Sequence, residues 1–383
     1  MARFVKLVLS AGEHDRALTP VTALVPGPVP AVPAFQLRDE KTHRCCACQV
    51  EAAQEGFSLT WLSAGLKAGQ TQRLVLESGR PQPPRVRIED QPVRGRADVH
   101  ILGKHFTSYV YGKEWVRPYL FPVIGPGGVQ VTRQYPLKHV RGEHQDHPHH
   151  KSIWVAHGDC NGVDNWSEEP KHGWQRHQRF ERLDSGPVFG RIRAVNFWCH
   201  SDGRKQFEET REIRFYALPG GVRLFDLDLV FHMSQGPVTF GDTKEGGLVS
   251  VRVASSMDVR NGGRIENAFG GVQERETWGQ AAAWCDYSGM AGGRRVGIAI
   301  LEHKSNPRFP TGWHVRDYGL MTANCFASSY YHPEAKLRGD MAFKKGQRPA
   351  WRYRLYIHKG DARQGRVSNR FLDYFAPPSV SVR

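Results

Sequence analysis

Alternation of apolar and polar residues is the feature that most constrains how this chain can fold. From Phe225 to Met233 every second residue is apolar, and Asp226, Asp228 and His232 lie between them. An extended strand places alternate side chains on opposite faces, so this pattern predicts a strand with one buried face. The same period predicts strands at Val129–Arg133, Val222–Met233, Val296–His303 and Trp351–His358. Between Glu208–Leu218 and Val222–Met233, the sequence Pro219-Gly220-Gly221 predicts a turn that joins the two segments as a hairpin.

These strands predict an all-β protein built on a large antiparallel β-sandwich. Amphipathic helical patterns are scarce, and only Ser368–Phe375 is expected to form a short helical turn. The 40 glycines and 24 prolines fit a chain with many turns between strands.

The length of 383 residues exceeds what one hydrophobic core usually organises, so we expect two parts. Residues 78–95 are polar and rich in proline, which predicts a linker. We therefore assign residues 1–95 to a small N-terminal β module with its linker and residues 96–383 to the sandwich. Inside the module, Phe57–Leu62 and Gln72–Leu76 are expected to be strands.

Composition argues against several classes of partner. No window approaches 18 uninterrupted apolar residues, so we expect no membrane association, and the short apolar run at the N-terminus predicts a first strand rather than a signal peptide. The net charge of +15 comes from dispersed arginines without a basic block, so we expect no nucleic-acid partner. The seven cysteines show no zinc spacing, and reduced thiols in a cytoplasmic protein are expected.

A histidine-rich segment is the strongest functional signal. Six of the 18 histidines lie from His139 to His157, with Asp146 among them and Asp159 directly after them. Pro148 favours an extended conformation for His147, which would place His147 and His149 on one side, where they could hold one divalent metal ion. Without a metal, His147, His149, His150 and His157 are candidates for acid–base chemistry, and a polar loop of mutually bonded histidines is the structural alternative.

Residues that could bind a sugar follow directly in the sequence. Aromatic rings can stack on sugar faces while short polar side chains bond hydroxyl groups, which makes Trp154, Asp159, Asn161, Asp164 and Trp166 candidates for substrate binding. A glycine-rich loop fixed by two buried tryptophans explains the same residues equally well.

Two later segments carry further polar groups. Lys244 and Glu245 stand in the glycine-rich GDTKEGG, where they could be a base beside its cation or a solvated turn. The segment HKSNPRFPTGWHVRDYG contains groups that protonate or stabilise an oxyanion, with Asp317 as a partner that could orient His314. Its candidates are Asn306, Arg308, His314, Arg316, Asp317 and Tyr318; an Arg316–Asp317 pair that only holds a loop is the alternative.

These blocks resemble a bacterial family commonly labelled "methane oxygenase PmoA". The resemblance rests on DHPHHKSIWVAHGDCNGVDNW, GDTKEGG, WCDYSG and HKSNPRFPTGWHVRDYG, and in order and spacing it covers most of the chain. It implies a supersandwich similar to the galactose-mutarotase-like and polysaccharide-lyase group, whose enzymes commonly act on sugars in a cleft on one sheet. It supports His147, His149, His150, His157, Glu245, His314, Arg316 and Asp317 as catalytic candidates, and Asn324 as a binding residue.

The leading hypothesis is a carbohydrate-active enzyme, of lyase or hydrolase type, that uses histidine acid–base chemistry on a small-molecule or oligosaccharide substrate. A metal-dependent oxidase or oxygenase, as the family label suggests, is the second hypothesis, and it requires a set of histidine and carboxylate ligands. A non-catalytic sugar-binding protein is the third. All three depend on the histidine-rich segment meeting WHVRDYG in one pocket.

Overall fold

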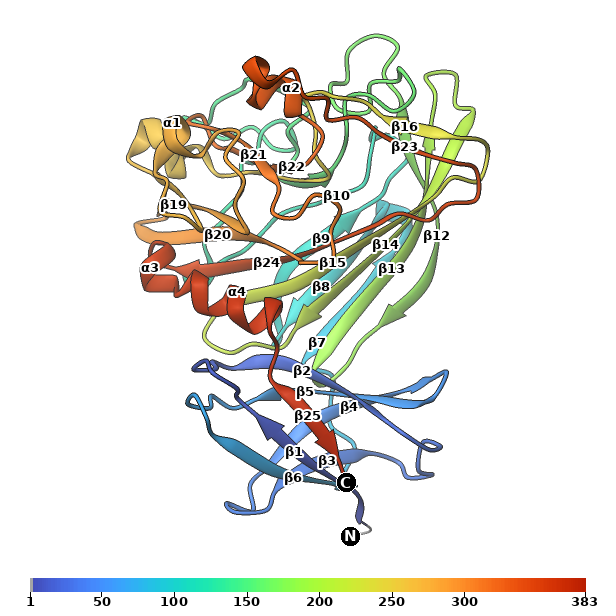
Figure 1. Ribbon diagram of the computed structural model, residues 1–383, viewed down its shortest axis with the longest axis vertical. Coiled ribbons are helices and arrows are strands. Elements are labelled where there is room, and N and C mark those ends of the chain that lie inside the picture. The colour runs from blue at the N-terminus through green and yellow to red at the C-terminus, as the bar shows by residue number, and fades with distance from the viewer. Residues whose placement is uncertain (1–2) are drawn as a thin grey trace.

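The computed structural model describes residues 3–383 and shows a nearly all-β molecule in two parts (Figure 1). The lower part is one antiparallel seven-stranded sheet in the order β2-β5-β4-β3-β6-β1-β25. Its strands are β1 (Arg3–Ser10), β2 (Thr19–Val25), β3 (Phe35–Asp39), β4 (Cys45–Ala53), β5 (Gly56–Ser63), β6 (Thr71–Ser78) and β25 (Ser379–Val382). Its hydrophobic core is formed by buried side chains of strands near both edges of the sheet, such as Leu7 of β1 and Leu59 and Trp61 of β5.

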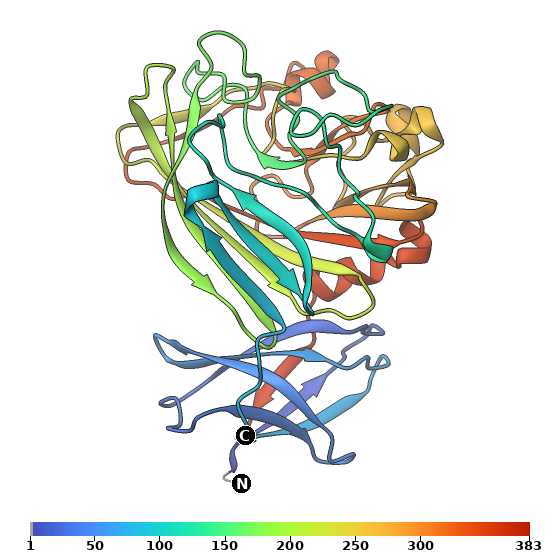
Figure 2. The same cartoon turned by 180° about the vertical axis from the view of Figure 1, so that it is seen from behind.

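The border between the two parts differs from the sequence prediction in two ways. The expected linker at residues 78–95 contains β7 (Val86–Gln91), which pairs with β8 (Arg96–Ile101) as the edge of a sheet in the upper part. The last strand, β25, returns to the lower part and pairs with β1, with Leu7 opposite Val382. Figure 2 shows the chain rising from the blue lower part into the cyan strands of the upper part.

The upper part is a sandwich of two antiparallel eight-stranded sheets, as the alternating pattern predicted. The first runs β21-β22-β17-β11-β10-β9-β8-β7 and adds β9 (Lys104–Val110), β10 (Tyr119–Leu120), β11 (Ile153–Val155), β17 (Val249–Arg252), β21 (Gly312–Arg316) and β22 (Leu320–Asn324). The second runs β12-β13-β14-β15-β24-β20-β19-β18, with β12 (Trp174–Asp184), β13 (Phe189–Cys199), β14 (Lys205–Tyr216), β15 (Arg223–His232), β18 (Arg264–Asn267), β19 (Trp284–Ala291), β20 (Arg294–Glu302) and β24 (Ala350–Lys359).

The predicted central strands are confirmed. β14 and β15 form the expected hairpin, with Phe215 opposite Phe225, and β24 and β20 continue the sheet. Phe225, Leu227, Leu229 and Phe231 all lie in the core between the two sheets, which is why every second residue of β15 is apolar.

The strand predicted at Val129–Arg133 is wrong. Gln130 and Thr132 make isolated bridges to Ile124 and Val253, and the segment forms no continuous strand. Arg133 instead turns its guanidinium toward the loop that follows, as described below.

The helices are short, as expected, and Ser368–Phe375 lies within α4 (Val367–Phe375). The others are α1 (Gln273–Thr277), α2 (Ser328–Tyr331) and α3 (Ala362–Gly365), and a two-stranded sheet joins β16 (Val238–Phe240) to β23 (Met341–Phe343). Within residues 3–383, no helix is long and apolar enough to cross a membrane.

Candidate active site

The candidate site lies on the outer face of the first sandwich sheet. On β21, Trp313 and Val315 point into the sandwich core, so His314 and Arg316 project from the opposite face. The register places His314 opposite Thr322 on β22, and the same row continues through Ser250 to Trp154. The sheet therefore provides a rigid floor with a polar row of side chains.

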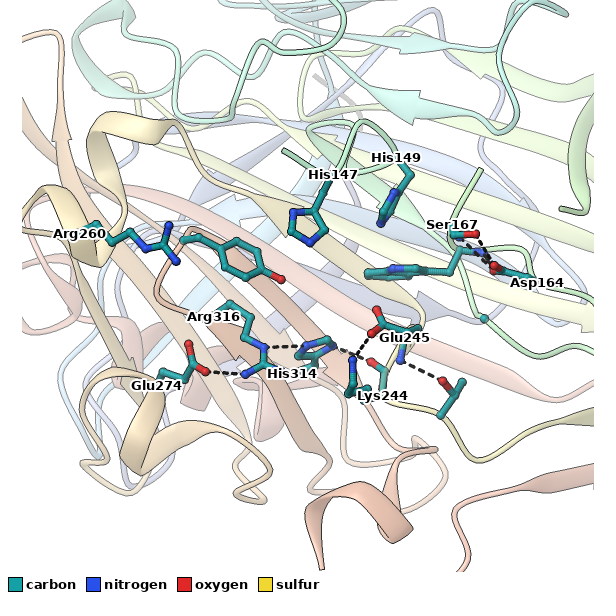
Figure 3. Close-up of a pocket in the computed structure, with 14 residues that line it drawn as sticks. His147, His149, Asp164, Ser167, Lys244, Glu245, Arg260, Glu274, His314 and Arg316 are labelled. Atoms are coloured by element: carbon teal, nitrogen blue, oxygen red, sulfur yellow. Dashed lines mark hydrogen bonds and ion pairs between the residues drawn. The ribbon is translucent and has the colours of Figure 1, made fainter. Parts of the chain in front are cut away.

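Loops beside this floor surround an open cavity of about 630 Å³. It brings together the histidine-rich segment, GDTKEGG and WHVRDYG, as the sequence hypothesis required (Figure 3). The cavity is lined by His147, His149, Gly158, Asp164, Trp166, Ser167, Thr243, Lys244, Glu245, Arg260, Glu274, His314, Arg316 and Tyr318.

The histidine loop is folded around the buried side chain of Arg133. Its guanidinium donates to the backbone carbonyls of Asp146 and His147, both at 2.7 Å, and of His150 at 3.3 Å. His147 adopts a left-handed backbone conformation with φ of 43°, so the predicted extended conformation is wrong. The cation at the centre of the loop, rather than strand pairing, sets where the histidines point.

Asp146 orients His147 and is itself held by two arginines. Its Oδ2 lies 3.3 Å from His147 Nδ1, while Oδ1 accepts a hydrogen bond of 2.6 Å from Arg252 and another from Arg133. Burial alone would raise the pKa of Asp146, but His147 and the two guanidinium groups hold that pKa well below its usual range. The carboxylate therefore stays charged and fixes the His147 ring, which stacks on Tyr318 with centroids 5.0 Å apart.

His149 projects into the cavity as a neutral base. Its ring nitrogens make no hydrogen bond within residues 3–383, and Figure 3 shows the ring directed toward Glu245. Burial lowers the pKa of His149 to about 3, and the nearby Arg117 contributes to the shift. At neutral pH the imidazole is therefore uncharged, and its ring nitrogens keep a free lone pair at the cavity.

His314 is held in one tautomer. Its Nδ1 lies 2.6 Å from the Lys244 carbonyl, and burial lowers its pKa to about 4, so the neutral ring donates Nδ1–H to that carbonyl. Its Nε2 accepts a hydrogen bond of 3.2 Å from Arg316 Nε. Arg316 is fixed in turn by Glu274, whose Oε1 accepts from Nη1 at 2.6 Å.

The prediction that Asp317 orients His314 is wrong. Asp317 lies outside the cavity, where its Oδ1 accepts from the backbone N–H of Glu274 at 3.3 Å. Its own backbone N–H donates to Glu274 Oε2 at 2.8 Å. Glu274 is thus the carboxylate that organises the end of β21.

Glycines allow the GDTKEGG loop to approach the sheet closely. A Cβ on Gly247, where φ is 98°, would lie 2.2 Å from the Ala323 carbonyl, and a Cβ on Gly158 would lie 2.5 Å from the Glu245 carbonyl. Asn324 donates from Nδ2 to the Thr243 carbonyl at 3.0 Å and so holds the loop from β22. The loop presents Lys244 and Glu245, which form an ion pair with each other at the cavity.

Several predicted site residues are buried behind the residues that line the cavity. His150 is buried between His147 and Trp154, and burial holds its pKa well below the usual value; Trp154 is also buried. His157 is buried against Phe326, with Nε2 3.0 Å from the Gly241 carbonyl. These side chains do not line the cavity, so direct contact between them and a substrate is not supported.

Other predicted residues hold loops. Asp159 accepts from the Gly162 backbone N–H, and Asn161 bonds Thr239 and Pro237. Asn306 is buried against the Arg352 backbone, and Arg308 donates to the carbonyls of residues 325, 339 and 340. None of these four residues lines the cavity, because their polar groups are occupied by backbone partners elsewhere.

Sequence reasoning missed four polar residues of the lining, Ser167, Thr243, Arg260 and Glu274. Thr243 belongs to GDTKEGG and Ser167 follows Trp166, so proximity to a recognised block could have indicated both. Arg260 and Glu274 stand outside the motifs, and only the tertiary fold brings them to β21.

The residues present do not form the expected metal site. Within residues 3–383, no group of three or more His, Cys, Asp or Glu side chains is placed to hold a metal ion. His147 and His149 approach each other with ring centroids 5.7 Å apart, but the nearest carboxylate, Asp146, is already bound by Arg133 and Arg252. A two-histidine set lacks the third protein ligand that metal centres in enzymes usually have.

Comparison with known proteins gives one family match. The family model described as "Family of unknown function (DUF6807)" matches residues 96–371, which include every residue that lines the cavity. No curated protein matches the sequence.

Among solved structures, the chain is similar to two proteins from Enterococcus faecalis. One is an alpha-mannosidase, with a TM-score of 0.46, 9% identity, and coverage of 99% of this chain and 46% of the other. The second is a protein in glycosyl hydrolase family 38, with a TM-score of 0.38, 11% identity, and coverage of 99% and 47%. The chain spans less than half the length of either protein.

Proposed function

We propose that this chain, which belongs to the DUF6807 family of unknown function, is a carbohydrate-active enzyme of the lyase type that acts on an acidic sugar. One observation carries the proposal: a neutral imidazole, that of His149, shares a polar cavity with the phenol of Tyr318 and the guanidinium groups of Arg316 and Arg260. These are a base, an acid and two cations at one open cavity.

The cavity suits a sugar in size and lining. A volume of about 630 Å³ is in the range of small-molecule sites. Hydroxyl, carboxylate and ammonium groups from Ser167, Thr243, Glu245 and Lys244 can bond sugar hydroxyls, while the Trp166 and Tyr318 rings offer apolar surface. The resemblance to the supersandwich enzymes supports the same substrate class.

The chemistry that fits these groups is β-elimination. His149 accepts the proton from the carbon beside the sugar carboxylate, the electron pair forms a C=C bond, and the C–O bond to the leaving sugar breaks. Burial raises the pKa of Tyr318 to about 12, so its hydroxyl keeps a proton that it can donate to the leaving oxygen. Arg316 and Arg260 stabilise the negative charge that develops on the carboxylate.

The carboxylates of the cavity support elimination over hydrolysis. Glycoside hydrolysis usually needs two free carboxyl groups that flank the scissile bond, one of them as proton donor. Here Glu245 is paired with Lys244, and Glu274 with Arg316. Asp164 accepts hydrogen bonds from the backbone and side chain of Ser167.

The test is an activity screen on acidic and neutral oligosaccharides with two readouts. Elimination produces an unsaturated product that absorbs in the ultraviolet, whereas hydrolysis produces reducing ends alone. We expect ultraviolet absorbance with acidic substrates only, and a loss of about 10²–10⁴-fold in kcat/KM for His149→Gln. His139→Gln is the matched control, because His139 is exposed and lies outside the cavity.

The pH profile adds a second test of His149. Because its pKa is lowered to about 3, kcat/KM should stay constant as the pH falls through 6.5 and decline only in strong acid. Reducing ends without ultraviolet absorbance would exclude the lyase type. Oligosaccharide binding that survives His149→Gln, without turnover of any substrate by the wild type, would favour a non-catalytic sugar-binding protein.

A further inference from the structure

A second cavity, of about 480 Å³, lies where the seven-stranded sheet meets the sandwich. It is lined by β5 and the β3–β4 turn on one side and by Val188, Ala217 and Pro219 of the sandwich on the other. Figure 1 shows this border below the sandwich, away from β21 and β22, which carry the candidate active site. Interfaces between structural units are common places for small-molecule sites.

The walls of this cavity are largely apolar. Leu62 packs against the cores of the sandwich, and Leu18, Val188 and Ala217 lie beside it at the cavity. An apolar molecule that enters this space would remove its own surface and that of the walls from water.

Two buried polar atoms of the lining lack a partner. Trp61 Nε1 and Ser63 Oγ belong to side chains that are each 1% exposed, and neither atom has a hydrogen-bond partner among the residues that the structure describes. Buried polar groups are almost always hydrogen-bonded, so an occupant that brought an oxygen acceptor to these two donors would satisfy both.

The charges at the cavity favour an anion. Arg44 and Arg85 line it with exposed side chains, and in the described part of the chain neither forms an ion pair. The one lining carboxylate, Asp39, accepts hydrogen bonds from the Thr42 backbone N–H at 2.6 Å and from Gln72 Nε2 at 2.8 Å, so neighbouring donors already satisfy it.

We propose that this cavity binds a small amphipathic anion, with its apolar body against Leu62, Val188 and Ala217 and an oxygen acceptor bonded by Trp61 and Ser63. Arg44 and Arg85 attract the negative charge. The proposal is independent of the chemistry assigned to His149, because the two cavities share no residue.

Decanoate is a suitable probe, with decanol as its neutral match. Titration calorimetry on the full chain should show saturable binding of one decanoate per chain and weaker binding of decanol. The double variant Trp61→Phe/Ser63→Ala keeps the apolar volume and should weaken decanoate binding by about tenfold. Arg44→Gln/Arg85→Gln should weaken decanoate about tenfold and decanol little, whereas Arg94→Gln/Arg363→Gln, the same charge change at exposed arginines outside the cavity, should change neither.

Cysteine labelling gives a readout that needs no variant of the lining. Cys45 is exposed and lines the cavity; burial raises the pKa of the adjacent Cys46 to about 11, which makes its thiol slower to react. Saturating decanoate should slow the labelling of Cys45 by a thiol reagent, and Cys45→Ser should identify the labelled position. Labelling at an unchanged rate, together with binding that Trp61→Phe/Ser63→Ala leaves intact, would overturn the site. Equal affinity for decanol would overturn its preference for anions.

Discussion

The replacement of His157 by glutamine tests whether folding holds this histidine as a buried, neutral ring behind the cavity. His157 is 0% exposed and packs on Phe326 and Phe240, with ring centroids 4.6 and 5.5 Å apart. Burial lowers its pKa to about 4. The folded protein therefore holds this ring neutral at pH values where the unfolded chain protonates it.

The expected size of the effect follows from proton linkage. The pKa of His157 is depressed on folding from its usual value of 6.5, so its contribution to stability is full above that pH and is lost as the pH falls toward 4. At about pH 5, roughly 1.5 units below the value in the unfolded chain, wild type should have lost about 2 kcal/mol through this one ring. Glutamine does not titrate, so the variant should escape that loss.

Urea denaturation of wild type and His157→Gln at about pH 8 and about pH 5 measures this difference. We expect the variant to be less stable at the higher pH, because packing against two aromatic rings is lost, and the gap to shrink by about 2 kcal/mol at the lower pH. Loss of packing is the same at both pH values, so the change in the gap isolates the titration. His139→Gln, at an exposed position, should show the pH dependence of wild type. An unchanged gap would refute the reasoning.

Two further predictions concern Glu302 and Gly158. Glu302 is 0% exposed, accepts from the Thr311 backbone N–H at 2.8 Å, and has its pKa raised by burial to about 8, so its stabilising contribution is full below pH 4.5 and is lost as the pH rises through 8. Glu302→Gln should therefore gain about 4 kcal/mol over wild type between about pH 5 and pH 9 in urea denaturation, and equal pH dependence would contradict this. Gly158→Ala should lower turnover by at least about tenfold, because its Cβ would force the Glu245 carbonyl away, whereas Gly236→Ala, with open space around it, should retain activity.

The strands at the centre of the sandwich could be predicted from the sequence, because every second residue of these strands faces the core and is apolar. β15 has a core-facing apolar row from Phe225 to Phe231, which no helix would produce. Composition did not predict the strand at the border of the two parts, because β7 contains charged residues yet forms an edge strand through backbone pairing. Val129–Arg133 shows the opposite failure: it alternates correctly, but its pairing with Ile124 and with Val253 is limited to two isolated bridges.

The sequence indicated His149, His314 and Arg316 as site candidates, because clusters of imidazole and guanidinium groups usually have a function. They did not reveal which histidines would face the cavity. That choice depends on Arg133, which stands before the histidine segment and binds its carbonyls. Glu274 was missed for a similar reason: its importance comes from bonds to Arg316 and Asp317 that only folding creates.

The pairing of β25 with β1 has a consequence for how the molecule assembles. The lower sheet takes six strands from residues 3–78 and its seventh from Ser379–Val382, so it remains incomplete until residues 379–382 have been synthesised. During synthesis, the edge of β1 that later pairs with β25 therefore stays unpaired while the whole sandwich forms. A fragment cut at residue 95 would therefore be an unfinished sheet, and attaching residues 379–382 after residue 78 through a short linker is the direct way to obtain this unit alone.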